Sequence, residues 1–517
     1  MLDDRLPITT RQIVLILFAA WVVVISCSIP NSSADEPILT PDVPTATSNQ
    51  PTSIPNEPAG TLNVPTATPF QPILTTSEPT STATITASTG SFELVGHTAL
   101  LQRGMNAALA LYGNYAYVGS RTDGSHPDAG VLVVDISNPA TPQVIYQIGP
   151  PEEGILGQTS RELRVWPEQE LLLILNFNCE TGLHDCQGSQ APPNISVYDI
   201  AGANASQPTL IAVHALGRTP HEFFLWDDPD VDGRALLYVS TPARFSDNLL
   251  VIDISRAREG VFEQVSSWSA PIGEFRETLH SLSLSADGRR AYLAHLRDGF
   301  MILDTSALAE GIPNPHIELL TPVESWVRSG PGAHSAVKLF GKAYALVTEE
   351  VYGRCPWGWT YLIDITDESR PAVVAEFKLD PYNTVEHCGE AAPERYRFTS
   401  FSSHNPTLTK NMAFISWHSG GLQAVSIENP LQPVQVAEFL PEPLPSVGTE
   451  DPALSSGPDK VVMWSYPIIK DGLIYVVDVR NGLYILKYHG PFEAEVAGIV
   501  FLEGNSNLGE ARLWERP

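Results

Sequence analysis

The chain has 517 residues, which is long enough for several domains or for one large repeat fold. Its acidic residues outnumber the basic ones by 59 to 30, which gives a formal net charge of −29 at pH 7. Because such a surface repels phosphate backbones, the composition argues against nucleic acid as a partner. The charge is typical of a protein that stays soluble outside the cell.

The N-terminus predicts a lipoprotein signal peptide over residues 1–26. Two arginines precede an apolar stretch from Ile13 to Ile25, which has the length of a signal-peptide core and is short for a membrane-spanning helix. The stretch runs into Ser26-Cys27, and this junction resembles a bacterial lipobox. The resemblance implies cleavage before Cys27 and its lipidation, so that acyl chains anchor the protein to the membrane on the extracytoplasmic side. An uncleaved signal anchor is the alternative, and it leaves the bulk of the chain on that same side.

Residues 27–90 predict a disordered linker. Pro, Ser and Thr make up about half of residues 28–90, which contain no Lys or Arg and one aromatic residue, Phe70. Such a segment cannot bury enough apolar surface to offset its ordering entropy. Its prolines favour an extended chain with a reach on the order of 200 Å. We interpret it as a stalk that holds the following domain away from the membrane.

Sequence repeats begin near Ser91 and continue toward the end of the chain. Each unit shows four short β-rich runs separated by turns, as one propeller blade requires. The third run is apolar and commonly ends on Asp, which we expect to bond the backbone of the following turn. In one unit the expected strands are residues 335–340, 343–347, 361–365 and 373–377. The third runs of the seven units are Leu132–Ile136, Ser196–Ile200, Leu250–Ile254, Met301–Asp304, Leu362–Ile365, Gln423–Ile427 and Leu483–Leu486.

These third runs resemble the LVIVD repeat, which is found in seven-bladed β-propellers. Leu132–Ile136 reads Leu-Val-Val-Asp-Ile, and Leu250–Ile254 reads Leu-Val-Ile-Asp-Ile. The resemblance covers residues 91–517 and says little about chemistry. Together with the repeat count it predicts an all-β fold, a seven-bladed β-propeller over residues 91–517, in an LVIVD repeat-containing lipoprotein.

The ends of the repeat region predict how the ring closes. Phe92–Gly96 has the pattern of an outermost strand, yet it precedes any innermost strand. We therefore expect it to complete the last blade beside Leu483–Tyr488, which removes an exposed sheet edge. The tail from Glu493 to Leu502 is the alternative occupant of that place. A closed ring needs no partner to hide an edge, so a monomer is expected.

The starts of the innermost strands carry a column of histidines. Equivalent residues on these strands form a ring around the propeller axis, so side chains far apart in the sequence are expected to converge. The ends of the second strands return to the same face and place further polar residues around the ring. The column consists of His221, His280, His334 and His404 in four consecutive units, with Asn106, Arg161 and Ser465 at the equivalent positions of the other three. The surrounding residues are His295, Glu349 and His418.

A ring of neutral imidazoles is a candidate site for copper, iron or zinc, with positions left open for water or substrate. A carboxylate such as Glu349 could orient one imidazole and fix its tautomer; Glu350 adjoins it, but adjacent side chains on a strand point to opposite faces. The architecture is similar to propellers with axial histidine-bound metals, including the carotenoid oxygenases and the selenium-binding/methanethiol oxidase family. No motif is specific enough to transfer their reactions. The alternative is a polar axial ring that binds no metal, because a histidine at a strand start can bond neighbouring backbone.

The cysteines suit an oxidising compartment once Cys27 is assigned to lipidation. Cys179 and Cys186 lie in one loop, and Cys355 and Cys388 lie on loops of neighbouring blades. All four are expected on the face that carries the histidines. Two disulfides, Cys179–Cys186 and Cys355–Cys388, are therefore our hypothesis. Loops fastened around a polar ring indicate a functional site more than closure alone.

Two functions are consistent with these features. The first is a lipid-anchored module at the cell surface that binds a protein, a glycan or a small ligand with its loop-bearing axial face. The second is a metal-dependent redox or oxygenase-like enzyme centred on the four histidines. No nucleotide-binding or hydrolase motif occurs in a suitable context, and no catalytic residue can be named. We take the binding module as the expectation, and metal analysis is the cheapest test that separates the two.

Overall fold

The computed structural model describes residues 89–149, 158–179, 185–187, 192–241, 248–271, 279–328, 330, 332–353, 355–379 and 398–515. The chain divides into two units, residues 1–79 and 80–517, and every described residue belongs to the second. The predicted signal peptide, Cys27 and nearly all of the predicted linker lie outside the described residues. No helix among the described residues is long and apolar enough to cross a membrane.

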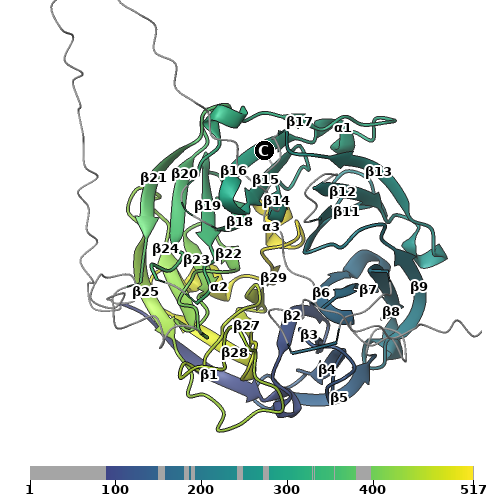
Figure 1. Ribbon diagram of the computed structural model, residues 1–517, viewed down its shortest axis with the longest axis vertical. Coiled ribbons are helices and arrows are strands. Elements are labelled where there is room, and N and C mark those ends of the chain that lie inside the picture. Colours follow the sequence, from purple (N-terminus) through teal and green to yellow (C-terminus); the bar gives the residue numbers. More distant parts are fainter. Residues whose placement is uncertain are drawn as a thin grey trace, which may run out of the picture. The chain divides into compact units, whose positions relative to one another are not determined.

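Antiparallel four-stranded sheets surround a central axis in the described part of the chain (Figure 1). Each sheet is one blade, and we call its strands A to D from the axis outward. The pairing gives seven blades, because the first two are joined into one sheet by a single bridge between Ser120 and Ser160. The predicted seven-bladed propeller is therefore confirmed.

The strands follow the blades in chain order. The first three blades are β2 (Asn106–Tyr112), β3 (Tyr115–Ser120), β4 (Val131–Asp135) and β5 (Gln143–Ile148); β6 (Gln158–Trp166), β7 (Leu171–Asn178), β8 (Asn194–Asp199) and β9 (Thr209–Ala215); and β10 (Phe223–Asp227), β11 (Ala235–Ser240), β12 (Leu249–Asp253) and β13 (Glu263–Trp268). The next three are β14 (Leu279–Leu284), β15 (Arg290–His295), β16 (Gly299–Asp304) and β17 (Glu318–Leu319); β18 (Ala333–Lys338), β19 (Tyr344–Glu349), β20 (Thr360–Asp364) and β21 (Ala372–Phe377); and β22 (Pro406–Leu408), β23 (Met412–Ser416), β24 (Leu422–Ser426) and β25 (Val434–Phe439). The seventh blade is β26 (Ile468–Lys470), β27 (Leu473–Asp478), β28 (Gly482–His489) and β1 (Ser91–Thr98), with β29 (Phe501–Leu502) added on the axial side of β26. The helices are short: α1 (Ser306–Ala309), α2 (Glu493–Ala497) and α3 (Glu510–Trp514).

The repeated apolar runs form strand C of every blade. In β4 the side chains of Val131 through Val134 are all fully buried, because neighbouring blades cover both faces of this strand. The outer strand β5 instead alternates between exposed and covered positions. Each fully buried Val or Leu of such a run contributes about 1.5–3 kcal/mol to folding. The Asp at the end of the run stabilises the turn that follows it. Asp135 Oδ1 accepts the backbone N–H of Ser137 at 2.8 Å, as predicted.

The ring is closed by the predicted pairing of the two ends of the repeat region. β1 lies antiparallel to β28, with Phe92 opposite Tyr488 and Thr98 opposite Leu483. The alternative, that the C-terminal tail occupies this place, is wrong. Residues Glu493–Ala497 form helix α2, and β29 pairs with β26 at the opposite, axial edge of the blade.

After β29 the tail passes along the inner strands at the end of the axis away from the histidine column. Asn505 O lies 3.4 Å from Arg164 Nε of the second blade, and Ser506 forms a bridge with Leu225 of the third. Asn507 Nδ2 then donates to the carbonyl oxygens of Asp227 at 2.8 Å and Ala286 at 3.0 Å. The tail thus ties the inner strands of several blades together. No repeat or periodic pattern in the sequence predicts this element.

Candidate functional site

The histidine column stands at irregular starts of strand A. His280 and His334 are the residues at which the pairing of strands A and B shifts register, and Arg161 occupies the same shift in the second blade. His221 and His404 precede their strands, and their backbone N–H groups donate to carbonyl oxygens of strand B, each at 2.9 Å. A β-bulge re-aims a side chain out of the regular alternation, and here it brings the imidazoles of successive blades together.

The four predicted histidines form one continuous arc. Ring centroids are 4.0 Å apart for His221 and His280, 4.1 Å for His280 and His334, and 3.9 Å for His334 and His404. His418, which follows β23, extends the arc with its ring 4.6 Å from that of His404. His221 is partly exposed, and the other four side chains are buried.

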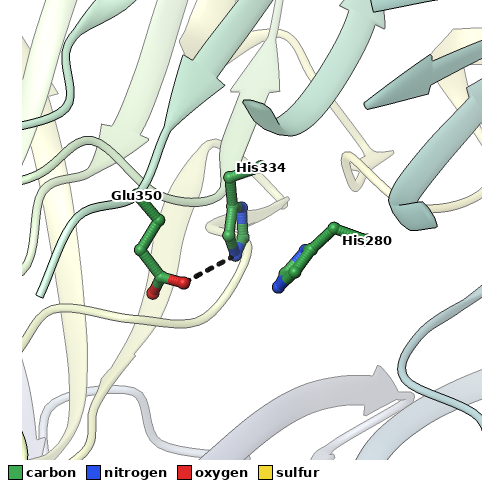
Figure 2. Close-up of side chains that lie close together, drawn as sticks. All are labelled: His280, His334 and Glu350. Carbon is green, nitrogen blue, oxygen red and sulfur yellow. Dashed lines mark ion pairs between the residues drawn. The ribbon is translucent and has the colours of Figure 1, made fainter. Parts of the chain in front are cut away.

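The carboxylate in contact with this arc belongs to Glu350, the residue after β19. Figure 2 shows it beside His334, with His280 next in line. His404 Nε2 and His418 Nε2 lie 3.2 and 3.3 Å from Glu350 Oε1, whereas His334 Nε2 lies 3.9 Å from Oε2. The Glu350 side chain is only 8% exposed. Two groups therefore have ligand atoms within 4.8 Å of one another, namely His280, His334 and Glu350, and Glu350, His404 and His418.

The hydrogen bond of His404 fixes its tautomer. Its Nδ1 lies 2.8 Å from the backbone carbonyl oxygen of Trp464. A carbonyl oxygen can only accept, so Nδ1 carries the proton and donates it. In a neutral imidazole Nε2 then has a bare lone pair, and this lone pair faces Glu350 Oε1 at 3.2 Å.

His418 has the same tautomer through a short hydrogen-bond chain. Its Nδ1 lies 2.9 Å from Ser400 Oγ, and that hydroxyl donates to the carbonyl oxygen of Val351 at 2.8 Å. Because the single hydroxyl proton of Ser400 is used on Val351, Ser400 Oγ accepts from His418 Nδ1. His418 Nε2 is therefore also a bare lone pair, directed at Glu350.

His334 follows the same arrangement. Its Nδ1 lies 2.8 Å from Ser335 Oγ, which donates to Asn405 Oδ1 at 3.1 Å. The Asn405 amide is itself oriented by Trp464, because its Nδ2 donates to the carbonyl oxygen of that residue. Three histidines thus have Nδ1 held by an acceptor and Nε2 turned to one carboxylate, which is the outer support that metal-ligating histidines commonly have.

Burial disfavours a positive charge on His280, His334 and His404. Burial lowers the pKa of His404 to about 3 and that of His280 to about 4, although Glu350 acts in the opposite direction on both. Burial likewise holds the pKa of His334 well below its usual value. Burial alone would raise the pKa of Glu350, and the pKa lies well below its usual value only while His334 or His404 carries a positive charge. The charge on Glu350 and the charge on these imidazoles therefore depend on each other.

The other predicted residues lie at or near the ring without joining this cluster. Asn106 Nδ2 donates to the carbonyl oxygen of Val479 at 3.1 Å, and Ser465 Oγ accepts the N–H of Val477 at 2.9 Å, so both support backbone. His295 Nδ1 lies 3.0 Å from Asp298 Oδ2. The Glu349 carboxylate lies on the other side of the strand, where it bonds the Tyr361 hydroxyl.

Arg161 occupies the ring position of the second blade. Its guanidinium lies 5.6 Å from the ring centroids of both Phe177 and Trp464, and burial lowers its pKa. Its Nε is buried with no hydrogen-bond partner among the described residues. The Arg121 guanidinium lies 5.0 Å from the centroid of the Trp464 ring and pairs with Asp451 at 3.2 Å.

A second charged cluster lies farther along the axis, toward the C-terminal tail. Arg164 is fully buried, and Glu162 Oε2 lies 3.4 Å from its Nη1. Glu222 and Glu503 are also buried, and both interact with Arg164. Burial raises the pKa of all three carboxyl groups, because one arginine cannot balance three negative charges.

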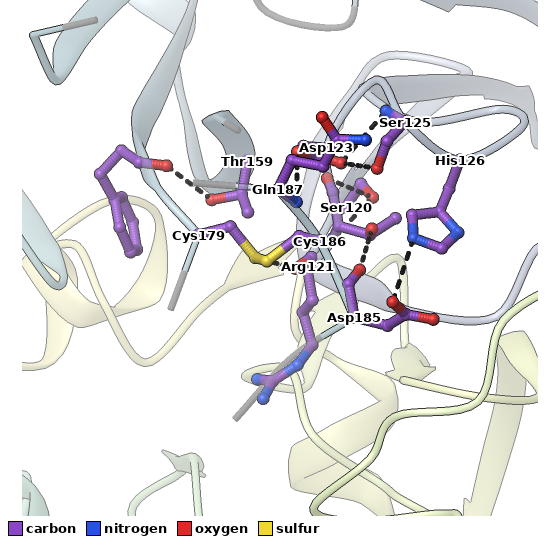
Figure 3. Close-up of a disulfide and its surroundings, with 12 residues drawn as sticks. Ser120, Arg121, Asp123, Ser125, His126, Thr159, Cys179, Asp185, Cys186 and Gln187 are labelled. Carbon is purple, nitrogen blue, oxygen red and sulfur yellow. Dashed lines mark hydrogen bonds and ion pairs between the residues drawn. A yellow bond between two sulfur atoms is a disulfide. The ribbon is translucent and has the colours of Figure 1, made fainter. Parts of the chain in front are cut away.

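One predicted disulfide is present, and it closes a loop of the second blade. Cys179 and Cys186 are bonded, with 6.3 Å between their Cα atoms (Figure 3). Beside the bond, Thr122 donates to the carbonyl oxygen of Asp185 at 2.7 Å, which ties the loop of the second blade to that of the first. Cys355 is disulfide-bonded as well, and Cys388, its predicted partner, lies outside the described residues.

Sequence reasoning missed several residues of the cluster. Glu350 donates its backbone N–H to Gly332 O at 2.8 Å, and its carboxylate accepts the Tyr352 hydroxyl at 2.5 Å. The alternation of side chains along a strand could have pointed to Glu350. Of two adjacent residues at the end of strand B, one faces the axis and the other faces away. Ser400, which holds His418, gives no such signal, because it lies in a loop and not in a repeat.

Comparisons with known proteins agree with the fold. Residues 103–147 match the family model of the LVIVD repeat, and no curated protein matches the chain. Two structures of Sqt1 from Chaetomium thermophilum are similar to this chain. The first has 14% sequence identity, covers 75% of this chain and 86% of its own, and has a TM-score of 0.44. The second has 12% sequence identity, covers 77% of this chain and 99% of its own, and has a TM-score of 0.45. A structure of Sqt1 bound to the N-terminus of the ribosomal protein L10 has 14% identity over 77% and 89%, with a TM-score of 0.42. At these TM-scores the likeness adds no argument of its own. The strand pairing and the family match together identify the chain as a seven-bladed β-propeller that carries the LVIVD repeat.

Proposed function

We propose that this chain is a lipid-anchored, extracytoplasmic binding module whose axial face binds its ligand through a transition metal ion. A β-propeller fold by itself suggests a module that binds a partner on one face. The metal is the more specific part of the proposal, and it follows from the chemistry of the cluster around Glu350.

The observation that carries the proposal is the convergence of two imidazole Nε2 atoms on one buried carboxylate oxygen. His404 Nε2 and His418 Nε2 both face Glu350 Oε1, at 3.2 and 3.3 Å, and each has its proton on Nδ1. A single proton on Oε1 would satisfy one of them and leave the other lone pair repelled. In a buried site such a repulsion is costly, because water does not screen it. A divalent cation between these atoms turns the repulsion into ligation. Imidazole nitrogen combined with carboxylate oxygen is a donor set suited to zinc, iron or copper.

Arg161 supports an anionic ligand for this face. Its buried guanidinium has aromatic neighbours but no ion pair among the described residues. Desolvating an arginine without a partner is unfavourable, and planar oxyanions are the ligands that its fork of donors fits. We therefore propose a small ligand with a carboxylate or similar oxyanion, held between the metal and Arg161.

Metal analysis of the full chain tests the metal. Protein purified without chelator is expected to carry at least one zinc, iron or copper ion per chain, measured by mass spectrometry. Ser400→Ala removes the acceptor of His418 Nδ1 and is expected to weaken metal binding by about 10–100-fold. Ser402→Ala is the matched control, because Ser402 is also buried and also donates to Val351 O, at 3.0 Å, but contacts no histidine. Wild-type protein without metal, or equal loss of affinity in both variants, would contradict the proposal.

The anchor is tested separately with Cys27→Ala. We expect the variant to lose incorporation of labelled fatty acid and to leave the membrane fraction. A variant that stays in the membrane would indicate an uncleaved signal anchor instead. Oxygen-dependent turnover by the metal-loaded protein would identify a metal-dependent enzyme in place of a binding module.

A further inference from the structure

We propose that the axial face holds two metal ions, bridged by the carboxylate of Glu350. The inference rests on the proposed function, which requires at least one ion. One ion would be bound by His404, His418 and Glu350 Oε1. The other would be bound by His334, His280 and Glu350 Oε2.

The two oxygens of Glu350 are divided between two sets of histidines. Oε1 lies 3.2 and 3.3 Å from the Nε2 atoms of His404 and His418, and Oε2 is the oxygen nearer to His334, at 3.9 Å. In each set the ligand atoms lie within 4.8 Å of one another, and Glu350 belongs to both sets. A carboxylate that presents one oxygen to each of two ions is the arrangement of two-metal sites, whose ions are about 3.5–4 Å apart.

A single ion would leave half of the cluster unexplained. With an ion on Oε1 alone, His334 would still direct a bare Nε2 at Oε2, because its Nδ1 proton is committed to Ser335. His280 would also remain a buried imidazole whose Nδ1 has no hydrogen-bond partner among the described residues. A second ion on Oε2 gives both imidazoles a role. Each ion then has three protein ligands, and the open positions between the ions can accept an anionic ligand.

The number of metal ions bound per full-length chain tests the two-ion proposal directly. Metal-depleted protein is titrated with Zn²⁺ in a calorimeter, and a parallel sample is loaded with Cu²⁺ for electron paramagnetic resonance. We expect two Zn²⁺ per chain and a spectrum in which two nearby Cu²⁺ ions interact. One Zn²⁺ per chain with an isolated Cu²⁺ spectrum would overturn the second ion and leave the proposed function standing. No binding at all would overturn both.

Variants assign the two ions to their ligands. His280→Gln and His418→Gln are each expected to reduce the stoichiometry from two ions to one and to abolish the interaction between the Cu²⁺ spins. Glu350→Gln is expected to weaken both ions at least 10-fold. His295→Gln is the matched control, because His295 is equally buried but lies against Asp298. Circular dichroism excludes unfolded variants, and the wild-type stoichiometry decides the question even if every variant fails to fold. Two ions retained in His280→Gln would also overturn the assignment.

Discussion

A histidine is a metal ligand only when its proton sits on the other nitrogen, and hydrogen-bond partners away from the cluster decide this for three residues. Trp464 O, Ser400 Oγ and Ser335 Oγ each accept from an Nδ1 atom. None of these acceptors touches Glu350, yet together they determine that lone pairs face it. The chemistry of the cluster is therefore set by residues that a search for ligands would pass over.

The buried carboxyl groups around Arg164 predict a pH-dependent stability. Burial raises the pKa of Glu162 to about 8, from 4.5 in an unfolded chain. A raised folded-state pKa favours the folded state at low pH, and this contribution is lost as the pH rises from 4.5 through 8. Glu162→Gln has no carboxyl group to ionise and therefore does not lose stability in this way. The free energy of unfolding of the variant minus that of the wild type should increase between pH 4.5 and pH 8, by at most about 1.4 kcal/mol per pH unit. Urea unfolding of both proteins at pH 5 and pH 8 measures the difference. An equal difference at both values would mean that Glu162 is ionised in the folded protein.

At this scale the sequence predicts residue types better than residue identities. The alignment of strand A starts brought out His221, His280, His334 and His404, because a repeat shows equivalent positions directly. It pointed to Glu349 where the structure has Glu350, since the choice depends on how the strand is twisted where β19 ends. Interactions such as Ser400 with His418 connect a loop to a strand end, and neither periodicity nor composition records them.

At the scale of elements, the C-terminal tail contributes more than its length suggests. The Asn507 side chain makes three hydrogen bonds to two blades, since its Oδ1 also accepts the N–H of Asp227 at 2.8 Å. Asn507→Ala leaves these buried backbone groups unpaired, and we expect a loss of about 3 kcal/mol in the free energy of unfolding. Asn429→Ala is the control, because Asn429 is exposed and accepts only a local turn N–H; its cost should stay below about 1 kcal/mol. Similar losses in the two variants would show that the tail does not hold the inner strands.

The elements themselves were largely predictable, and the tail was not. In the fifth blade the expected strands agree with β18 to β21 within two residues at every boundary, because strand C is a continuous apolar run and turns separate the others. The tail lacks both signals. β29 has only two residues, and the segment after it is held by asparagine side chains and backbone pairing, which leave no periodic pattern in the sequence.

At the scale of the whole molecule, the propeller depends on a strand from the start of its own repeat region. β1 covers the outer edge of β28, and Phe92 packs against Tyr488 and Phe414, with ring centroids 5.7 and 6.2 Å away. Phe414 belongs to the sixth blade, so β1 also holds the last two blades together. Without β1 the outer edge of the seventh blade is open, and the first and last blades remain joined through inner contacts such as the bond of Asn106 to Val479.

Two truncations separate closure from the rest of the N-terminal region. A chain that starts at residue 89 keeps β1, and its melting temperature should equal that of the full chain. A chain that starts at residue 99 lacks β1 and should melt at least about 10 °C lower, since several kcal/mol of pairing and aromatic packing are lost. It should also associate at high concentration, because the exposed edge of β28 can pair with a second copy. Differential scanning calorimetry and size-exclusion chromatography measure both effects. A synthetic peptide of residues 89–98 that restores the melting temperature would show that the strand acts by closing the ring, whereas equal melting temperatures for the two truncations would show that the ring does not need it.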